Sequence, residues 1–217
     1  MVKEKKMKAF IYTGGEIDCA GITERPDEQD IVIAADSGYK NAKLMGMNPQ
    51  VILGDFDSLN KDALKSEKCE IITVPAEKDF TDTQLAVSEA LKRGAKQMII
   101  IGGLSGRLDH TLSNLAILED MHSKGIRATI TDGNNRVTYL KNDSALIMRS
   151  QFKYISLIAR SEKVKGVEIE GCKYSLKNAV LTDKYQYAVS NEITGNCAFV
   201  SVKKGAVLII ESKDRPQ

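Results

Sequence analysis

Five aspartates each stand shortly after one of three short apolar runs, IVIAA (31–35), VIL (51–53) and EIITV (70–74). They are Asp36, Asp55, Asp57, Asp79 and Asp82. Carboxylates that gather at one place repel each other unless a cation lies between them. Oxygen ligands without His or Cys favour Mg²⁺ or Mn²⁺, and Mg²⁺ commonly bridges to substrate phosphates. The pattern therefore predicts metal-assisted phosphate chemistry, although each aspartate taken alone could equally be a helix cap or a turn residue.

A glycine-rich turn, Gly102 to Gly106, precedes a helical stretch and forms the second candidate site. Small residues allow backbone N–H groups to approach a phosphate, and a helix N-terminus favours an anion. Arg107 adds a guanidinium that can bind two oxygens at once. The GK[ST] ending of a Walker A loop is missing. His110, one turn into the helix, is either a phosphate or nucleotide contact or a surface or packing residue.

Residues 8–132 alternate short Ile- and Val-rich runs with polar turns and helical stretches. Uninterrupted apolar runs are typical of strands that are buried on both faces of a parallel sheet. Thr81 and Gln84 have the spacing of a capping box that opens a helix through Leu91. Four leucines predict one buried face of a later helix: Leu108, Leu112, Leu115 and Leu118. We expect an α/β domain with a doubly wound parallel sheet, whose strands would bring the aspartates and the glycine-rich turn to one edge.

Beyond Gly133 the rhythm changes to short strands that alternate apolar and polar residues, with turns too short for a helix. This pattern predicts an all-β unit, a small sandwich or barrel. The expected domains are 1–133, an α/β catalytic domain, and 134–217, a β-sandwich domain.

The overall composition excludes several classes of protein. The net charge of +2 argues against a dedicated nucleic-acid binder, which needs a basic excess. The longest uninterrupted apolar runs have five residues, too few for a membrane span. The basic start MVKEKKMK is followed by no apolar stretch, and the four cysteines include no CxxC pair. We therefore expect reduced thiols, no structural zinc and a cytoplasmic protein.

Five segments together resemble bacterial thiamine pyrophosphokinases (thiamin diphosphokinases): AADSG, GDFDS, KDFTDTQLA, GGLSGRLDHTLSNL and SNEITGNCAFVSVKKGAVLIIES. The resemblance runs from Ala34 to Ser212. It implies an N-terminal α/β domain for ATP and Mg²⁺, a C-terminal β-sandwich for thiamine, and a homodimer with the thiamine site at the subunit interface. It also implies transfer of a pyrophosphoryl group from ATP to the hydroxyl of thiamine, which gives thiamine diphosphate and AMP.

The resemblance also assigns roles to single residues. It implies that Mg²⁺ and the triphosphate are bound by Asp36, Asp55, Asp57, Asp79 and Asp82. Of these, Asp57, Asp79 and Asp82 are the expected catalytic residues. ATP contacts fall to Lys78, Gly103, Ser105, Arg107, Asp109 and His110. Thiamine contacts fall to Gln84, Ser190 and Asn191. The acceptor of the hydroxyl proton is either Asp82 or Asp57.

This sequence departs from the family pattern at two places. Eukaryotic relatives stack a Trp on the pyrimidine of thiamine, and this chain contains no Trp. Lys78 stands where some relatives have a Gln. Two other functions fit the same residues: a metal-dependent phosphohydrolase that releases phosphate without an acceptor, and a nucleotide- or thiamine-binding regulator without turnover.

Overall fold

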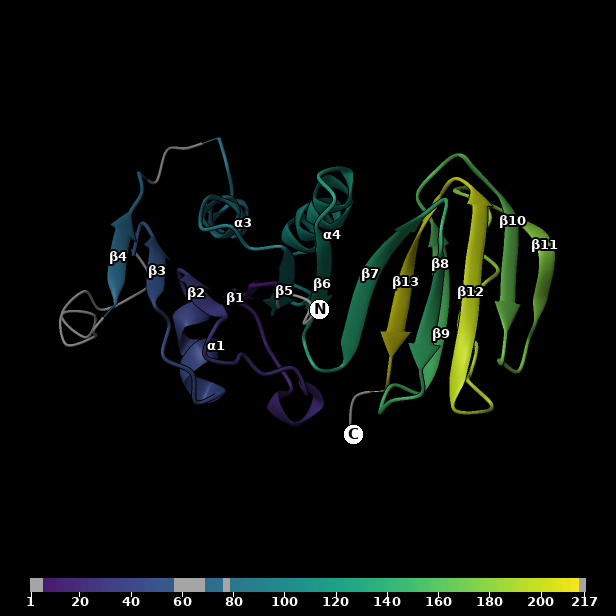
Figure 1. Cartoon of the computed structure of the whole chain (residues 1–217), viewed down its shortest axis with the longest axis horizontal. Helices are drawn as coiled ribbons and strands as arrows, with labels where there is room; N and C mark the ends of the chain where they lie inside the picture. The colour runs from purple at the N-terminus through teal and green to yellow at the C-terminus, as the bar shows by residue number, and fades with distance from the viewer. Residues whose placement is uncertain (1–5, 57–68, 76–78, 215–217) are drawn as a thin grey trace, which may run out of the picture. The chain divides into compact units, whose positions relative to one another are not determined.

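The chain forms two compact units, Met1–Gly133 and Asn134–Gln217 (Figure 1). The computed structural model describes residues 6–56, 69–75 and 79–214. No helix in these ranges is long and apolar enough to cross a membrane. None of the four cysteines, all of which lie in these ranges, forms a disulfide.

The first unit is built on a parallel sheet. Its described strands run in the order β4-β3-β2-β1-β5-β6. Their bounds are β1 Lys8–Tyr12, β2 Ile31–Ala35, β3 Val51–Gly54, β4 Glu70–Thr73, β5 Gln97–Ile101 and β6 Arg127–Thr131. Strands β2, β3 and β4 extend the sheet on one side of β1. Strands β5 and β6 then extend it on the other side of β1. The strand order therefore reverses between β1 and β5, the arrangement of a doubly wound sheet.

Burial follows the position of each strand in this sheet. Strands β2 and β3 are buried along their whole length, and β1 and β5 are buried except for their first residue. The prediction of uninterrupted burial is wrong for β4, in which Glu70, Ile71 and Thr73 are exposed. Strand β4 ends the described order and pairs with β3 alone there, so only part of its surface is covered.

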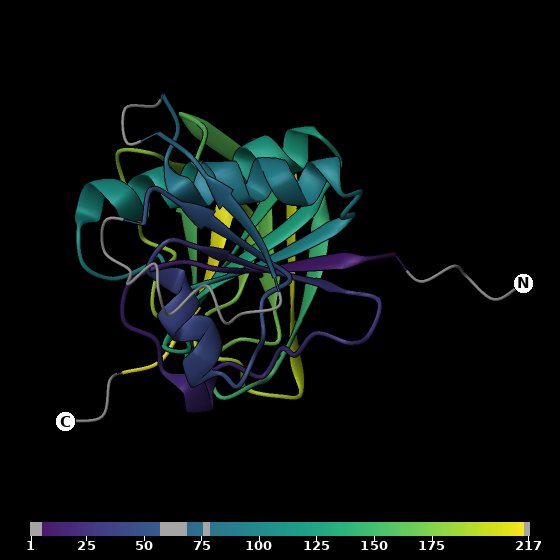
Figure 2. The ribbon, with the colours of Figure 1, turned by 90° about the vertical axis from the view of Figure 1, so that its left-hand side faces the viewer.

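Helices cover both faces of the sheet. In Figure 2, α1 (Gly38–Leu44) lies on one face, whereas α3 (Asp82–Lys92) and α4 (Leu108–Ser123) lie on the other. A short 3-10 helix, η1, spans Cys19–Gly21. The capping box predicted for α3 is present, because Thr81 and Gln84 each bond the backbone N–H of the other. Helices on both faces explain why the inner strands are apolar throughout.

The buried face of α4 agrees with the prediction at Leu118 and differs from it at Leu108 and Leu112. The buried residues are Asn114, Ile117, Leu118 and Met121, which have the i, i+3, i+4, i+7 spacing of a helix face. Leu108 and Leu112 are 70% and 56% exposed. They belong to the first turns of the helix and precede its buried residues, the first of which is Asn114.

One residue of β1 carries a buried polar atom at an energetic cost. Tyr12 is fully buried, and its hydroxyl has no hydrogen-bond partner among the described residues. Because burial disfavours the phenolate, the pKa of Tyr12 is raised to about 12. An unsatisfied buried hydroxyl costs about 1–3 kcal/mol.

We therefore expect Tyr12→Phe to raise the free energy of unfolding by about 1 kcal/mol at pH 7. The stabilities of the wild-type protein and of Tyr12→Phe should also respond differently to alkaline pH. Between pH 10 and about 12 the unfolded tyrosine loses its proton while the folded one keeps it, so wild-type stability falls by about 1.4 kcal/mol per pH unit from this group. Urea unfolding at pH 7 and across this range measures both effects. A variant that is less stable at pH 7 would contradict the prediction.

The second unit is all-β. One antiparallel sheet has the order β7-β13-β9 and the other the order β11-β10-β12-β8. Their bounds are β7 Asn135–Lys141, β8 Ser144–Met148, β9 Tyr154–Ala159, β10 Lys163–Glu170, β11 Leu176–Thr182, β12 Cys197–Lys204 and β13 Ala206–Ser212. Burial alternates along β9, and over most of β10 and β12, so one face of each sheet is apolar.

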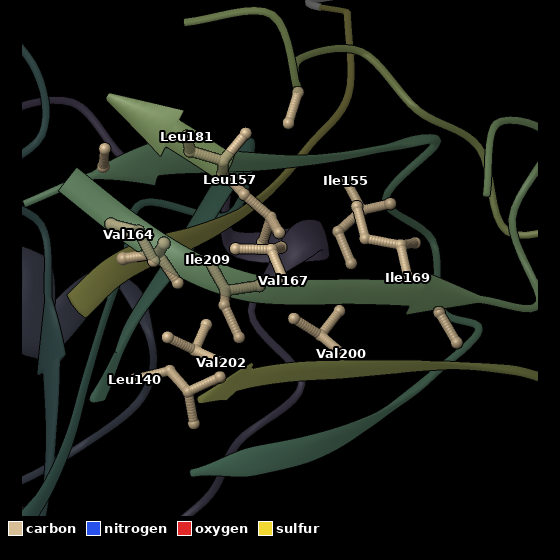
Figure 3. Close-up of a cluster of buried hydrophobic side chains, with 14 residues drawn as sticks. Leu140, Ile155, Leu157, Val164, Val167, Ile169, Leu181, Val200, Val202 and Ile209 are labelled. Carbon is tan, nitrogen blue, oxygen red and sulfur yellow. The ribbon is translucent and has the colours of Figure 1, made fainter. Parts of the chain in front are cut away.

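The two sheets share one core, which makes the unit a sandwich. Figure 3 shows Leu157 and Ile209 of the first sheet beside Val167 and Leu181 of the second. Each of these side chains is at most 3% exposed. The predicted fold class, a doubly wound parallel sheet followed by an all-β sandwich, is confirmed.

Candidate active site

A pocket lies where the strand order of the parallel sheet reverses. Its volume is about 400 Å³. In an open α/β sheet, ligands bind at this point because the connections on either side diverge and leave a crevice. The lining residues come from the segments after β1, β2 and β5 and from the starts of α3 and α4: Thr13, Gly14, Gly15, Ala35, Asp36, Ser37, Thr81, Asp82, Thr83, Gly103, Ser105, Gly106, Arg107, His110 and Asn114.

The glycine-rich turn after β5 packs closely against the turn after β1. The N–H of Gly103 donates to the carbonyl of Gly14 at 2.9 Å, and the buried amide of Asn114 donates to the carbonyl of Gly103 at 3.0 Å. Gly103 has φ +73°, and a Cβ there would lie 2.5 Å from Nδ2 of Asn114 and 3.0 Å from Oγ1 of Thr13. Only glycine fits this position without displacing a neighbour.

Two polar side chains hold the turn after β1 in place. The hydroxyl of Ser105 accepts a hydrogen bond from the N–H of Glu16 at 2.7 Å. On the other side, the buried Asn41 of α1 donates to the carbonyls of Thr13 and Gly15 at 2.7 and 2.9 Å. The wall of the pocket is therefore fixed by hydrogen bonds before any ligand binds.

Asp36 lines the pocket in a strained backbone conformation. Its φ is +43°, and Phe56, on the next strand end, has φ +59°. Such values cost a non-glycine residue about 1–2 kcal/mol and are tolerated where the surroundings hold them. The N–H of Asp36 donates to the carbonyl of Leu53 at 2.7 Å, which ties the two strand ends together. Such strain is typical of functional positions.

Helix α3 presents a second carboxylate to the same pocket. Asp82 is the first residue of α3 and lines the pocket, and the capping box beside it fixes the start of the helix. The N–H of Thr81 donates to Oε1 of Gln84 at 2.8 Å, and the N–H of Gln84 donates to the hydroxyl of Thr81 at 3.2 Å. Asp36 and Asp82 thus face one cavity from two different elements.

We expect Thr81→Ala to lower the free energy of unfolding by about 1 kcal/mol, because one N–H at the helix start loses its acceptor. The start of α3 should also become less well positioned, so catalytic efficiency with the substrate that binds in this pocket should fall severalfold. Thermal unfolding and initial rates measure the two effects. Thr81→Ser keeps the hydroxyl and serves as the control; equal losses in both variants would contradict the assignment.

Arg107 is the N-cap residue of α4, and its side chain is paired with a carboxylate. Its Nη2 and Nε donate to the two oxygens of Asp109 at 2.6 and 3.2 Å. The backbone N–H of His110 also donates to Asp109, at 2.9 Å. The hydrogen bonds from Arg107 hold the pKa of Asp109 below its usual range and raise the pKa of Arg107. Both side chains are exposed, so the fork orients Arg107 without burying it.

Two family models match the chain in sequence. Residues 23–130 match the model described as thiamin pyrophosphokinase, catalytic domain, and residues 144–207 match thiamin pyrophosphokinase, vitamin B1 binding domain. The thiamine pyrophosphokinase of Bacillus subtilis (strain 168) is 30% identical over 197 residues, 89% of this chain and 92% of that protein. The chain belongs to the thiamine pyrophosphokinase family. Thiamin pyrophosphokinase 1 of Caenorhabditis elegans is 28% identical over 172 residues, 75% of this chain and 70% of its own length.

Solved structures of thiamine pyrophosphokinases have the same fold. The crystal structure of the enzyme from Bacillus subtilis matches with a TM-score of 0.86 at 27% identity, covering 97% of this chain and 100% of that chain. The structure of the thiamin pyrophosphokinase from Geobacillus thermodenitrificans matches with a TM-score of 0.82 at 26% identity, covering 96% of this chain and 98% of that chain. The likeness therefore includes both units.

Part of the site expected from the thiamine pyrophosphokinase resemblance lines the pocket. The residues concerned are Asp36, Asp82, Gly103, Ser105, Arg107 and His110. Asp55 directly follows β3 and is half-buried, whereas Asp79 is exposed, and neither lines the pocket. Asp57 and Lys78 lie outside the described residues. Within the described ranges, no three His, Cys, Asp or Glu side chains are grouped as ligands of a metal ion.

The residues expected to bind thiamine have other contacts in this structure. Gln84 takes part in the capping box of α3 and lines a neighbouring groove between α3 and α4. Ser190 and Asn191 belong to the second unit. Ser190 is exposed with φ +56°, and its N–H donates to the hydroxyl of Ser156 at 3.0 Å. Asn191 is buried.

Sequence reasoning missed two residues that shape the pocket of this thiamine pyrophosphokinase family member. Asn41 and Asn114 support its glycine turns from two helices. A polar residue among the buried positions of a helix was the available signal, since a buried amide requires hydrogen-bond partners. The amides of both asparagines donate hydrogen bonds to backbone carbonyls of tight turns.

Proposed function

We infer that this chain transfers a pyrophosphoryl group from ATP to the hydroxyl of thiamine, giving thiamine diphosphate and AMP. The observation that carries the inference is that both family models, catalytic and vitamin B1 binding, follow one another in a single chain. A phosphohydrolase acting on a nucleotide alone needs no domain for a second substrate. A regulator without turnover does not need paired carboxylates beside a glycine-rich turn.

We propose that the triphosphate of ATP binds in the pocket at the start of α4. The N-terminus of α4 favours an anion there, whereas the N–H groups of Gly102 and Gly103 already donate to the carbonyls of Thr131 and Gly14. Arg107 supplies a fork for phosphate oxygens, with Asp109 as its orienting partner. His110 lines the same pocket and is proposed to contact the nucleotide or a phosphate, with Lys78 as a further ATP contact.

The residues of the pocket fit Mg²⁺. Asp36 and Asp82 offer hard oxygen ligands to one cavity, and Mg²⁺ is usually bound by one or two carboxylates together with substrate phosphates. We assign Asp36, Asp55, Asp57, Asp79 and Asp82 to this role. When bound, the ion would neutralise charge on the phosphates.

The proposed reaction is an in-line displacement at the β-phosphorus. The hydroxyl oxygen of thiamine forms a bond to the β-phosphorus, and the bond from this phosphorus to the oxygen that bridges to the α-phosphorus breaks. AMP leaves with the bridging oxygen, and the hydroxyl proton passes to a carboxylate, Asp82 or Asp57. Asp79 is the third proposed catalytic residue. The protein contributes mainly by positioning and by electrostatic stabilisation.

Thiamine recognition is assigned to Gln84, Ser190 and Asn191. We propose that the protein is a cytoplasmic homodimer and that the thiamine site lies at the interface of two subunits. Size-exclusion chromatography with light scattering tests the dimer directly, and a monomer at working concentration would contradict it.

A single assay tests the reaction. Protein, ATP, Mg²⁺ and thiamine are mixed and the products are separated by chromatography. AMP and thiamine diphosphate in equal amounts are the expected result. ADP with thiamine monophosphate would place the attack at the γ-phosphorus, and phosphate released without thiamine would favour a hydrolase.

A further inference from the structure

Strand β8 has one edge that no other described strand covers. It is the last strand of its sheet, and among the described strands it pairs with β12 alone. The N–H of Arg149, directly after β8, donates to the carbonyl of Asn196, directly before β12, at 2.8 Å. Bonds of this kind recur at every second residue of an antiparallel strand, so the N–H and C=O groups of Leu146 and Met148 point away from β12. The backbone of β8 can therefore accept a further strand.

The exposed side chains of β8 are mainly apolar. Leu146 and Met148 are 63% and 59% exposed, whereas Ala145 and Ile147 pack against the core of the sandwich. Phe199 of β12 lies opposite Leu146 and is 36% exposed. Edge strands are commonly protected from pairing by a charged residue or a proline, and β8 contains neither. An apolar edge of this kind favours contact with another strand.

The segment from Asp143 to Arg149 is complementary to a second copy of itself in the antiparallel orientation. When Leu146 of one copy lies opposite Leu146 of the other, Asp143 lies opposite Arg149 at both ends. Ser144 then lies opposite Met148. In this register the N–H and C=O groups of the two Leu146 residues bond to each other, and the N–H of Met148 donates to the carbonyl of Ser144. Opposite charges that face each other across antiparallel strands stabilise the pair.

The two charged ends of this segment are available for such a contact. Asp143 and Arg149 are both exposed, and neither forms an ion pair with any residue that the structure describes. Oδ1 of Asp143 accepts the N–H of Ser144 at 2.8 Å, which leaves the second carboxylate oxygen for a cation. A guanidinium that donates to a carboxylate makes one of the stronger hydrogen bonds in proteins.

We propose that β8 is an association surface for a second copy of this chain, which pairs with it about Leu146 and joins the two four-stranded sheets into one. The copies are related by a two-fold axis, since each contributes the same residues. A strand of another protein would need this order of charges and apolar residues by coincidence, whereas a second copy always supplies it. The inference is independent of the proposed function, because no residue of 143–149 is assigned to ATP, Mg²⁺ or thiamine.

The first test places a charge at the centre of the pair. Sedimentation equilibrium measures the mass at about 1 mM protein, a concentration at which even a weak pair is populated. Wild-type protein should have at least twice the mass of Leu146→Lys, in which two ammonium groups would face each other. Leu44→Lys is the matched control and should behave as wild type, because Leu44 is 69% exposed in α1 of the first unit. Equal masses for wild type and Leu146→Lys would overturn the proposal.

The second test reverses one charge at a time. Asp143→Lys and Arg149→Glu each bring like charges together in a pair of identical copies, so each variant should associate about tenfold more weakly than wild type. An equimolar mixture of the two should recover the wild-type dissociation constant to within about threefold, because every charged end then faces an opposite charge. Recovery requires that both variants are folded and that residue 143 meets residue 149. A mixture that associates no better than either variant alone would overturn the proposal.

Hydrogen exchange locates the contact. The amide protons of Leu146 and Met148 should exchange at least about tenfold more slowly in concentrated than in dilute wild-type protein. Unchanged exchange would mean that the copies meet elsewhere, or that this edge receives a different protein, and the proposal would be wrong.

Turnover measured on the same samples separates this inference from the proposed function. Association through β8 without formation of thiamine diphosphate would support the inference and overturn the function. Formation of thiamine diphosphate by wild type and Leu146→Lys of equal mass would do the reverse.

Discussion

Asp36→Asn is expected to lower kcat/KM for ATP by about 10²–10³-fold, with a change of less than about 0.5 kcal/mol in the free energy of unfolding. The substitution removes the negative charge from the pocket and keeps the shape of the side chain. Asparagine also tolerates the left-handed conformation that Asp36 adopts at φ +43°, so the backbone can stay in place. A catalytic defect without a folding defect is therefore the signature of a charge that acts on the substrates.

Steady-state kinetics with varied Mg²⁺ and urea unfolding check this prediction. The half-saturating Mg²⁺ concentration should rise if Asp36 helps to hold the ion. Glu28→Gln is a suitable control, because it removes the charge of an exposed carboxylate that does not line the pocket. Activity within threefold of wild type in Asp36→Asn would refute a role in metal or phosphate binding.

Gly103→Ala is expected to reduce kcat/KM for ATP about 100-fold and the free energy of unfolding by about 2–4 kcal/mol. The new methyl group would meet Asn114 and Thr13, and alanine is strained at φ +73°. The turn must then move, and a displacement near 1 Å in a binding site can cost about 100-fold in rate.

Gly106→Ala separates the two causes. Gly106 has φ +83°, close to that of Gly103, but nothing lies within 4 Å of a Cβ added there. This variant should lose only about 1 kcal/mol of stability, from backbone strain. Initial rates and thermal unfolding of both variants measure the difference. Equal effects would show that the close packing of the two turns is unimportant for ATP binding.

The first unit was largely predictable from sequence because its signals are local. Uninterrupted Ile and Val runs predicted the strands, and the Thr81–Gln84 pair predicted the start of α3. The parallel order then brings Asp36, Asp82 and the Gly102–Gly106 turn to one pocket. The prediction was wrong for the exposed β4 and for the buried face of α4. Both depend on which neighbours cover an element, and no local pattern contains that information.

The side-chain partners within the site could not be predicted. Whether an asparagine meets a ligand or a carbonyl depends on residues distant in sequence: Asn41 bonds the turn after β1, and Asn191 bonds Tyr174 across 17 positions. Resemblance to a family carries residue types to positions, but it does not show how their hydrogen bonds are distributed. Asn191 illustrates this, because its amide is directed at the main chain of Tyr174.

Residue types and their spacing were sufficient for the class of fold and the order of the two units, since periodicity and turn residues act over a few neighbours. Three-dimensional packing settled the rest. It set the strand order that opens the pocket beside β1, the glycine conformations that close its wall, and the burial that directs the amide of Asn114 to a backbone carbonyl. These properties arise from contacts between segments far apart in the chain, where van der Waals fit and hydrogen-bond satisfaction act on the whole unit at once.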